Sequence, residues 1–276
     1  MQSLWMLAAS LLFASMGVCV KLASEHGFSA AEIVFYRSAI SVCLMLPLLW
    51  WKGISLATPY WRFHVQRSVS GFVALTLYFW SITLLPLATA VTLNYTAPIF
   101  LAVLLVFVSR ERLKPMMGLA LVIGLMGVVV LLHPTFQSDQ LLGGIIGLSS
   151  GVLAAVAYFN VRELGAKGEP EARIVFYFST ISTLCSLGWL WFSEIHSVTF
   201  LNVWLLLGVA GFATLAQLAM TRAYKRGKTM LSASLAYTTV IFSSLYGMLF
   251  WGEHLGFDAW IAIGMIVLSG ILAGRR

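Results

Sequence analysis

Charged residues are scarce in this sequence, and most of them fall between long apolar runs. Of the 276 residues, 17 are Lys or Arg and 10 are Asp or Glu, so that only 10% are charged, while 60% are hydrophobic. A soluble globular domain carries about 25% charged residues. The composition therefore excludes an ordinary soluble domain and predicts an all-α membrane protein, with the lipid bilayer as its main partner.

Acidic residues and histidines are absent from the middle of every apolar run. All ten Asp and Glu and all five His lie near the ends of the runs or between them. A carrier that exchanges a proton or a cation normally keeps a carboxylate inside the membrane. The sequence therefore argues against such coupling and favours a neutral or zwitterionic substrate.

The groups that enzymes and metal sites need are also missing. No nucleophile stands near a base, and no phosphate-binding glycine loop occurs. The three cysteines, Cys19, Cys43 and Cys185, lie inside apolar runs without metal-ligand spacing, so we interpret them as small buried hydrophobes. We expect no catalytic activity, no metal and no cofactor.

The apolar runs are long enough to cross a bilayer, which takes about 20 residues as a helix. The first run lacks the basic start of a signal peptide and is expected to remain as a helix. We predict ten transmembrane helices, at residues 3–23, 30–51, 65–84, 87–108, 115–132, 143–162, 172–193, 203–223, 229–250 and 256–274.

The basic residues predict the orientation. With the N-terminus inside, 15 of the 17 Lys and Arg, Arg67 among them, fall on the inner side, and only Lys21 and Arg37 fall at outer helix ends. This is the positive-inside pattern. It predicts both termini in the cytoplasm and location in the inner (plasma) membrane. It also accounts for the net charge of +7 without a nucleic-acid partner.

The two halves of the chain are related. The segment 33–41, IVFYRSAIS, recurs at 174–182 as IVFYFSTIS, with seven of nine positions identical, and Tyr95 matches Tyr237 at nearly the same offset. Each unit has five spans, so the two copies must insert in opposite orientations. We therefore predict an inverted repeat of residues 1–136 and 137–276, with a substrate site near the midplane where the halves meet.

The stretch Asn94–Pro98 lies in the middle of a predicted span. Proline removes a backbone donor and tends to distort a helix. Because the second copy keeps Tyr237 but lacks the proline, we expect a distortion in the first half only.

The segments 104–131 and 246–272 resemble the signature of the EamA branch of the drug/metabolite transporters. Each has a glutamate after an apolar helix (Glu111, Glu253) and then a helix with spaced glycines. The resemblance implies that the first, third, fourth, sixth, eighth and ninth helices surround a central cavity. It also implies export or exchange of small metabolites, often amino acids.

Polar and aromatic residues on the helices that this resemblance places around the cavity are the candidate substrate contacts. Such residues also serve in helix–helix packing, so each alone is ambiguous. Asn94 points away from the neighbouring threonines on an ideal helix and is open to either interpretation. The candidates are Tyr78, Trp80, Asn94, Tyr95, Thr96, Asn160, Gln217, Tyr237, Thr239 and Tyr246.

The charged residues near the helix ends can be interpreted in two ways. Lys21 and Arg37 either pair with Glu25 and Glu32 or attract a substrate carboxylate at the outer mouth, and Arg162 is the corresponding cation at the inner mouth. Glu111 and Glu253 precede helices, where a carboxylate stabilises free N–H groups. We therefore interpret these two glutamates as helix caps.

These features predict a secondary carrier that exports a small metabolite, such as an amino acid or a similar zwitterion, by alternating access. The open alternatives are an uptake carrier, another substrate class (nucleotide precursor, organic cation or lipid-linked sugar), and a membrane enzyme or scaffold. The chain is expected to act as a monomer or homodimer.

Overall fold

The structure, a computed structural model, describes residues 2–112, 114–133, 140–191, 193, 195–252, 254 and 256–274. The apolar runs form helices of roughly the predicted lengths. The helices are η1 (Gln2–Leu4), α1 (Trp5–Glu25), α2 (Ala30–Trp51), α3 (Trp61–Leu84), α4 (Leu87–Asn94), α5 (Ala97–Phe107), α6 (Pro115–Leu132), α7 (Leu141–Ala166), α8 (Glu171–Leu190), α9 (Phe200–Arg226), α10 (Thr229–Ala236), α11 (Thr238–Trp251) and α12 (Phe257–Gly274).

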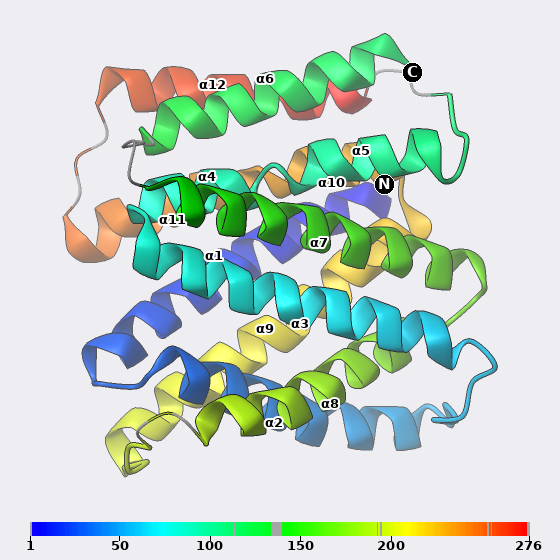
Figure 1. Ribbon diagram of the computed structural model, residues 1–276, viewed down its shortest axis with the longest axis vertical. Coiled ribbons are helices and arrows are strands. Elements are labelled where there is room, and N and C mark those ends of the chain that lie inside the picture. Colours follow the sequence, from blue (N-terminus) through cyan, green and yellow to red (C-terminus); the bar gives the residue numbers. More distant parts are fainter. Residues whose placement is uncertain are drawn as a thin grey trace.

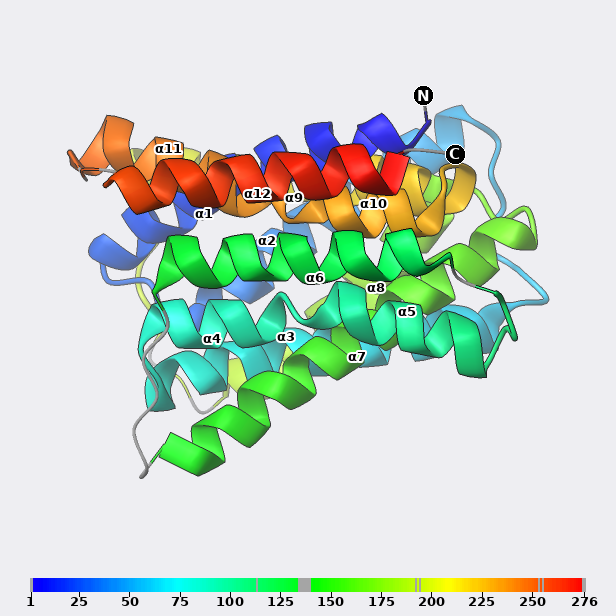
Figure 2. The same cartoon turned by 90° about the horizontal axis from the view of Figure 1, so that it is seen from above.

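Ten spans are confirmed. Within the described residues, nine segments are long and apolar enough to cross a membrane, with α4 and α5 forming one span and α10 and α11 another. The more polar α3, 24 residues long, is the tenth. Figures 1 and 2 show that α1 begins and α12 ends at the same end of the bundle, as an even number of spans requires. We call this the termini end and the other the far end.

The helices pack as two inverted five-helix repeats. The most extensive contacts between the halves join α3 to α7 and α1 to α9, two pairs that the repeat exchanges. The other two extensive contacts, α2 with α8 and α6 with α12, each join a helix to its own repeat mate and lie at opposite edges of the bundle in Figure 1. A pseudo-two-fold axis therefore passes between the members of these self-matched pairs.

The boundary that we predict between the repeats, after residue 136, lies outside the described residues. The described part of the first repeat ends at His133, and the second resumes at Gln140.

Both central spans are broken at the matched tyrosines. In the first half, α4 ends at Asn94 and α5 starts at Ala97, with Pro98 in the first turn of α5. In the second half, α10 ends at Ala236 and α11 starts at Thr238. At each break the backbone tightens to three-residue hydrogen bonds, from Thr96 N to the Leu93 carbonyl (3.2 Å) and from Tyr237 N to the Ser234 carbonyl (3.3 Å).

The expectation that only the proline-containing half is distorted is wrong. Threonine supplies the reason, because its hydroxyl can donate a hydrogen bond to a backbone carbonyl of the preceding turn. The Thr96 hydroxyl donates to the Leu93 carbonyl (2.5 Å), and the equivalent Thr238 hydroxyl donates to the Leu235 carbonyl (2.6 Å). A hydroxyl at the same repeat position accompanies both breaks, whereas the proline accompanies one.

The first break is packed closely against α7 at Gly151. A Cβ atom on Gly151 would lie 2.6 Å from Thr96 Oγ1 and 2.8 Å from the Leu93 carbonyl oxygen. Because the second of these atoms belongs to the backbone, it cannot move aside without shifting the helix. Gly151 is therefore the residue that lets α7 approach the broken span.

Gly151→Ala is expected to destabilise the protein by about 1–3 kcal/mol through overpacking. Gly118→Ala in α6 is the matched control, since nothing lies within 4 Å of its added Cβ, and it should change stability by about 1 kcal/mol or less. Thermal unfolding of both variants in detergent measures the difference. Equal unfolding temperatures would contradict the close packing at the break.

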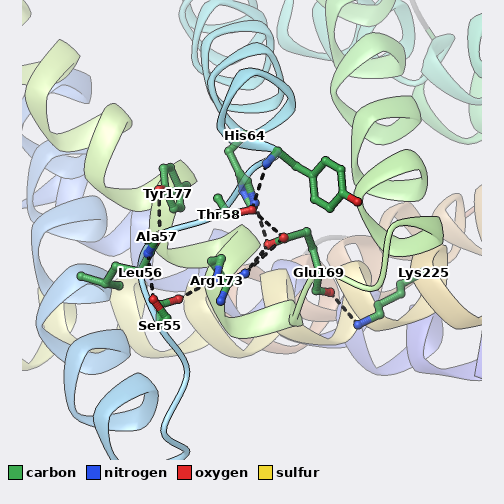
Figure 3. A network of polar contacts seen from close by, with 10 residues as sticks. Ser55, Leu56, Ala57, Thr58, His64, Glu169, Arg173, Tyr177 and Lys225 are labelled. Carbon is green, nitrogen blue, oxygen red and sulfur yellow. Dashed lines mark hydrogen bonds and ion pairs between the residues drawn. The ribbon is translucent and has the colours of Figure 1, made fainter.

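A buried polar network joins three segments at the termini end (Figure 3). The Glu169 carboxylate accepts hydrogen bonds from Thr58 Oγ1 (2.6 Å), His64 Nε2 (3.0 Å) and Arg173 Nη1 (2.9 Å). The Glu169 carbonyl accepts from Lys225 Nζ (2.6 Å). Although burial alone would raise the pKa of Glu169, these hydrogen bonds hold it below its usual value of 4.5. The network fixes the α2–α3 loop against α8 and α9.

A smaller network occupies the equivalent place at the far end. Glu32 completes a capping box with Ser29 at the start of α2. The same carboxylate accepts from the His196 backbone N (2.5 Å) and contacts His196 Nδ1 (3.1 Å). The repeat thus holds the α8–α9 connection at the far end as it holds the α2–α3 loop at the termini end.

Candidate functional site

A cavity of about 330 Å³ lies between the two halves. Its walls come from α1, α3, α4, α5, α7, α9, α10 and α11, and also from α2 and α8. The resemblance to the EamA signature implied all of these except α2 and α8. Those two helices add one residue each, Arg37 and Phe178, because they face each other as a self-matched pair.

Arg67 is the most deeply buried charge on the cavity wall. The charge pattern of the sequence predicts that Arg67 is an inner-side topology charge, but α3 starts at Trp61, so Arg67 lies six residues, or about 9 Å, along the helix. Its side chain is 3% exposed. Its Nη2 donates to Gln217 Oε1 (3.2 Å), and its guanidinium carbon lies 4.4 Å from the centre of the Phe178 ring.

Arg37 also reaches the cavity, not the outer mouth. It lies seven residues into α2, and its guanidinium carbon is 5.9 Å from the centre of the same Phe178 ring. The expected pairing of Arg37 with Glu32 does not form, since the carboxylate of Glu32 is held by Ser29 and His196.

The charges on the cavity wall are of one sign. Among the described residues that line it, the charged ones are Arg37 and Arg67, and none is Asp, Glu or His. Neither arginine forms an ion pair with another described residue. The rest of the wall is largely aromatic or aliphatic, including Tyr158, which stacks on Tyr224 (5.3 Å between ring centres).

Half of the predicted substrate contacts line this cavity. They come from both halves of the chain and include two of the three predicted contacts at the first break, Asn94 and Tyr95. Asn94, which was open to two interpretations, does both: it lines the cavity and donates from Nδ2 to Ser150 Oγ (3.1 Å). The five are Tyr78, Asn94, Tyr95, Gln217 and Thr239.

The other five lie away from the cavity wall. Trp80 is 52% exposed on the outside of α3. Thr96 and Asn160 bond to backbone carbonyls of their own helices. Tyr246 bonds to Ser15 through its hydroxyl (2.9 Å). Tyr237 is fully buried behind Tyr95, with 6.3 Å between the ring centres, so it backs the site without lining it.

The other predicted mouth cations and the described cap candidate contact side chains near the helix ends. Lys21 lies over the Trp251 ring (3.8 Å), and Arg162 forms ion pairs with Glu111 and Glu163. Glu111 therefore neutralises Arg162; it does not cap α6, whose start has no side-chain cap. Glu253 lies outside the described residues.

Among the cavity residues that the sequence analysis did not identify are Arg67, Phe178 and Tyr158. Two signals were available. An arginine inside a span is a functional candidate by default, and residue 178 differs between otherwise matching repeats, with Arg37 in the first copy and Phe178 in the second.

Gln217 positions Arg67, so two different substitutions of Gln217 can test the role of the charge on Arg67. Gln217→Glu would turn the hydrogen bond into an ion pair and neutralise Arg67, so we expect transport to fall about tenfold with stability unchanged or higher. Gln217→Leu removes the acceptor and should lower both transport and stability. Transport assays in liposomes and thermal unfolding separate the two. Transport by the glutamate variant at the wild-type rate would exclude a role for the charge on Arg67.

Comparison with known proteins agrees with this arrangement. The model of the EamA-like transporter family matches the chain twice, over residues 1–133 and 141–275. The chain belongs to this family. The two EamA matches coincide with the two inverted halves, and members of the family are transporters, so this chain is a multi-pass membrane transporter and not an enzyme.

Related EamA proteins carry names for different substrates. The chain is similar to the pseudopaline exporter CntI of Pseudomonas aeruginosa, at 31% identity over 245 residues, 89% of this chain and 86% of that protein. It is similar to a riboflavin transporter of Vibrio cholerae at 26% identity, over 97% and 90% of the two chains. A solved structure with 20% identity covers 99% of this chain and 96% of its own, with a TM-score of 0.88, which supports the fold.

Proposed function

We propose that this chain exports a small carboxylate-bearing metabolite, an amino acid or a similar zwitterion in the simplest case, from the cytoplasm by alternating access. The observation that carries the proposal is the cavity between the two inverted halves, with two arginines on its wall and no acidic residue among its described lining. Guanidinium groups bind carboxylates through paired, charge-assisted hydrogen bonds. The aromatic wall would hold the remainder of the molecule.

The paired breaks supply the points of movement. Short three-residue hydrogen bonds inside a helix often mark hinges, and here they occur at Tyr95 and Tyr237 in equivalent places of the two halves. In the proposed mechanism the halves rock about the bound substrate, so that the cavity opens first to one side and then to the other. The substrate keeps its contacts with Arg67 while the surrounding helices move.

The direction of transport and the orientation of the protein in the membrane are supported by separate observations. The distribution of basic residues supports a cytoplasmic termini end and location in the inner membrane. Export is supported by the relative from Pseudomonas aeruginosa, which is named as an exporter, whereas a relative from Rickettsia prowazekii, 26% identical over 59% of this chain, is named as an S-adenosylmethionine uptake transporter. Uptake is therefore the second candidate direction.

Purified protein in liposomes tests the proposal. Vesicles loaded with an unlabelled amino acid mixture should accumulate labelled amino acids by counterflow, and empty vesicles should not. A series of imposed pH gradients tests coupling: we expect exchange without a gradient, because no carboxylate lines the described part of the cavity. Strict dependence on a proton gradient would contradict the uncoupled mechanism. Failure of every carboxylate-bearing solute would contradict the substrate class.

A further inference from the structure

The two cavity arginines leave a charge imbalance that the described residues do not correct. Both side chains carry a permanent positive charge. Arg67 is 3% exposed, and its Nε is buried without a hydrogen-bond partner. Among the described residues, no carboxylate pairs with Arg67 or Arg37. A buried charge without a counter-charge is strongly unfavourable, so the site is built to receive negative charge.

The two guanidinium groups lie at the same part of the cavity. Both lie against one ring, that of Phe178, at 4.4 Å for Arg67 and 5.9 Å for Arg37. They come from opposite ends of the bundle, since α2 begins at the far end and α3 at the termini end. A molecule in the cavity therefore meets one cation from each side.

The position of Arg67 is fixed by its neighbours. Gln217 accepts a hydrogen bond from its Nη2, and Gly71, one turn further along α3, leaves the space that the guanidinium fills. A Cβ on Gly71 would collide with Arg67 Nη1 and lie 3.1 Å from Phe178 Cε2. The guanidinium is thus oriented before any ligand binds.

From this arrangement we infer that the preferred substrate carries two carboxylate groups, one for Arg37 and one for Arg67, on an organic body that fits the aromatic wall. This inference rests on the proposed function and narrows it. A zwitterion brings one carboxylate and places its ammonium group in the field of the second arginine. A dicarboxylate neutralises both cations and leaves no unpaired charge in the cavity.

The cavity limits the size and nature of the body. A volume of about 330 Å³ holds a small metabolite. Besides the arginines, the wall offers rings and aliphatic groups, among them Phe13, Leu75 and Tyr95. An aliphatic or flat linker between the two acid groups would pack against these side chains and gain from burial of its apolar surface.

A pair of ligands that differ by one charge tests the inference. Full-length protein in liposomes is loaded with glutarate, and uptake of labelled glutarate is followed by counterflow. Unlabelled dicarboxylates of increasing length and their monomethyl esters serve as competitors. We expect the diacid to compete about tenfold or more better than its own monoester, because the ester loses one charge-assisted contact.

Variants of single arginines test whether the preference for the diacid over its monoester depends on Arg37. Arg37→Gln should abolish the preference for the diacid, whereas Arg37→Lys should keep it at lower affinity. Arg62→Gln is the control, since Arg62 is an exposed cation at the start of the same α3, and it should keep the wild-type preference. A preference that survives Arg37→Gln in a folded protein would overturn the inference.

The remaining outcomes separate the inference from the proposed function. Equal competition by diacid and monoester overturns the inference, as does exchange of amino acids without any competition by diacids; in both cases the proposed function stands. Competition by sn-glycerol 3-phosphate without competition by dicarboxylates also overturns it, in favour of a phosphate group. If neither amino acids nor any of these anions exchange, both the inference and the proposed function fail.

Discussion

Replacing Arg67 with methionine is expected to lower transport by about a hundredfold or more while the protein unfolds at the same or a higher temperature. The loss follows from removing charge-assisted hydrogen bonds to a substrate carboxylate, each worth about 1.5–3 kcal/mol. The unchanged stability follows because a buried charge with one hydrogen bond is costly to the folded state, and an apolar side chain of similar length is often neutral or stabilising in its place.

Counterflow in liposomes and thermal unfolding in detergent measure the two effects on the same preparation. Arg62→Met is the control, because it removes an exposed arginine from the same helix and should leave both properties near the wild type. A methionine variant of Arg67 that transports normally would remove the basis for the proposed site. One that unfolds far below the wild type would assign Arg67 a structural role.

Replacing Glu169 with alanine is expected to destabilise the protein by about 3–5 kcal/mol, the usual cost of removing one partner from a buried ionic network. The carboxylate is 4% exposed and holds Thr58, His64 and Arg173 together (Figure 3). Without it, the α2–α3 loop loses its attachment to α8. Glu171→Ala is the control, since its pair with Arg226 (3.1 Å) is half-exposed on the arginine side and worth about 1 kcal/mol or less.

The same network predicts how stability depends on pH. The folded pKa of Glu169 is lower than its usual value of 4.5. The network's contribution to stability is therefore fully present above about pH 4.5 and is lost as the pH falls through the lowered folded value. Thermal unfolding measured from pH 7 to pH 3 should show a steeper loss of stability for the wild type than for Glu169→Ala. Parallel curves for the two proteins would contradict the role of the carboxylate.

The spans and the inverted repeat could be predicted because each rests on many residues at once. Ten apolar runs specify ten spans, and the repeated segment beginning at Ile33 specifies the equivalence of α2 and α8. Within such a pattern the error at any helix end is small. The start of α3 shows that even such an error matters, since the helix starts four residues earlier than predicted and carries Arg67 further into the bundle.

The cavity could be predicted only in part, because lining depends on which face of a helix turns inward. Gln217 and Tyr95 were identified since polar residues in a span need partners. Arg67 was interpreted as an inner-side topology charge and Arg37 as a cation of the outer mouth, because a count of basic residues by loop does not register depth within a helix. Tyr237 was included by its symmetry with Tyr95, but it packs beside Gly124, behind the cavity wall.

The second break shows a further limit of sequence reasoning. A proline in the sequence predicts a distorted helix. A threonine whose hydroxyl donates to a backbone carbonyl cannot be distinguished in sequence from any other threonine. Thr96 and Thr238 act alike at the two breaks. Their positions match in sequence, but the hydrogen bonds that they share are visible only in the structure.

Arg37 and Phe178 occupy the same position of the two repeats and meet across the self-matched pair α2 and α8. In an antiparallel homodimer of single repeats, a residue at this place would face its own copy. Two arginines would repel each other there, and two phenylalanines would leave one cation in the cavity. When the repeats are joined in one polypeptide, positions 37 and 178 can carry different residues. A polar residue on α2 can then face an apolar residue on α8 at the centre of a symmetric fold. The chemical asymmetry of this site is thus one that a homodimer of single repeats could not have.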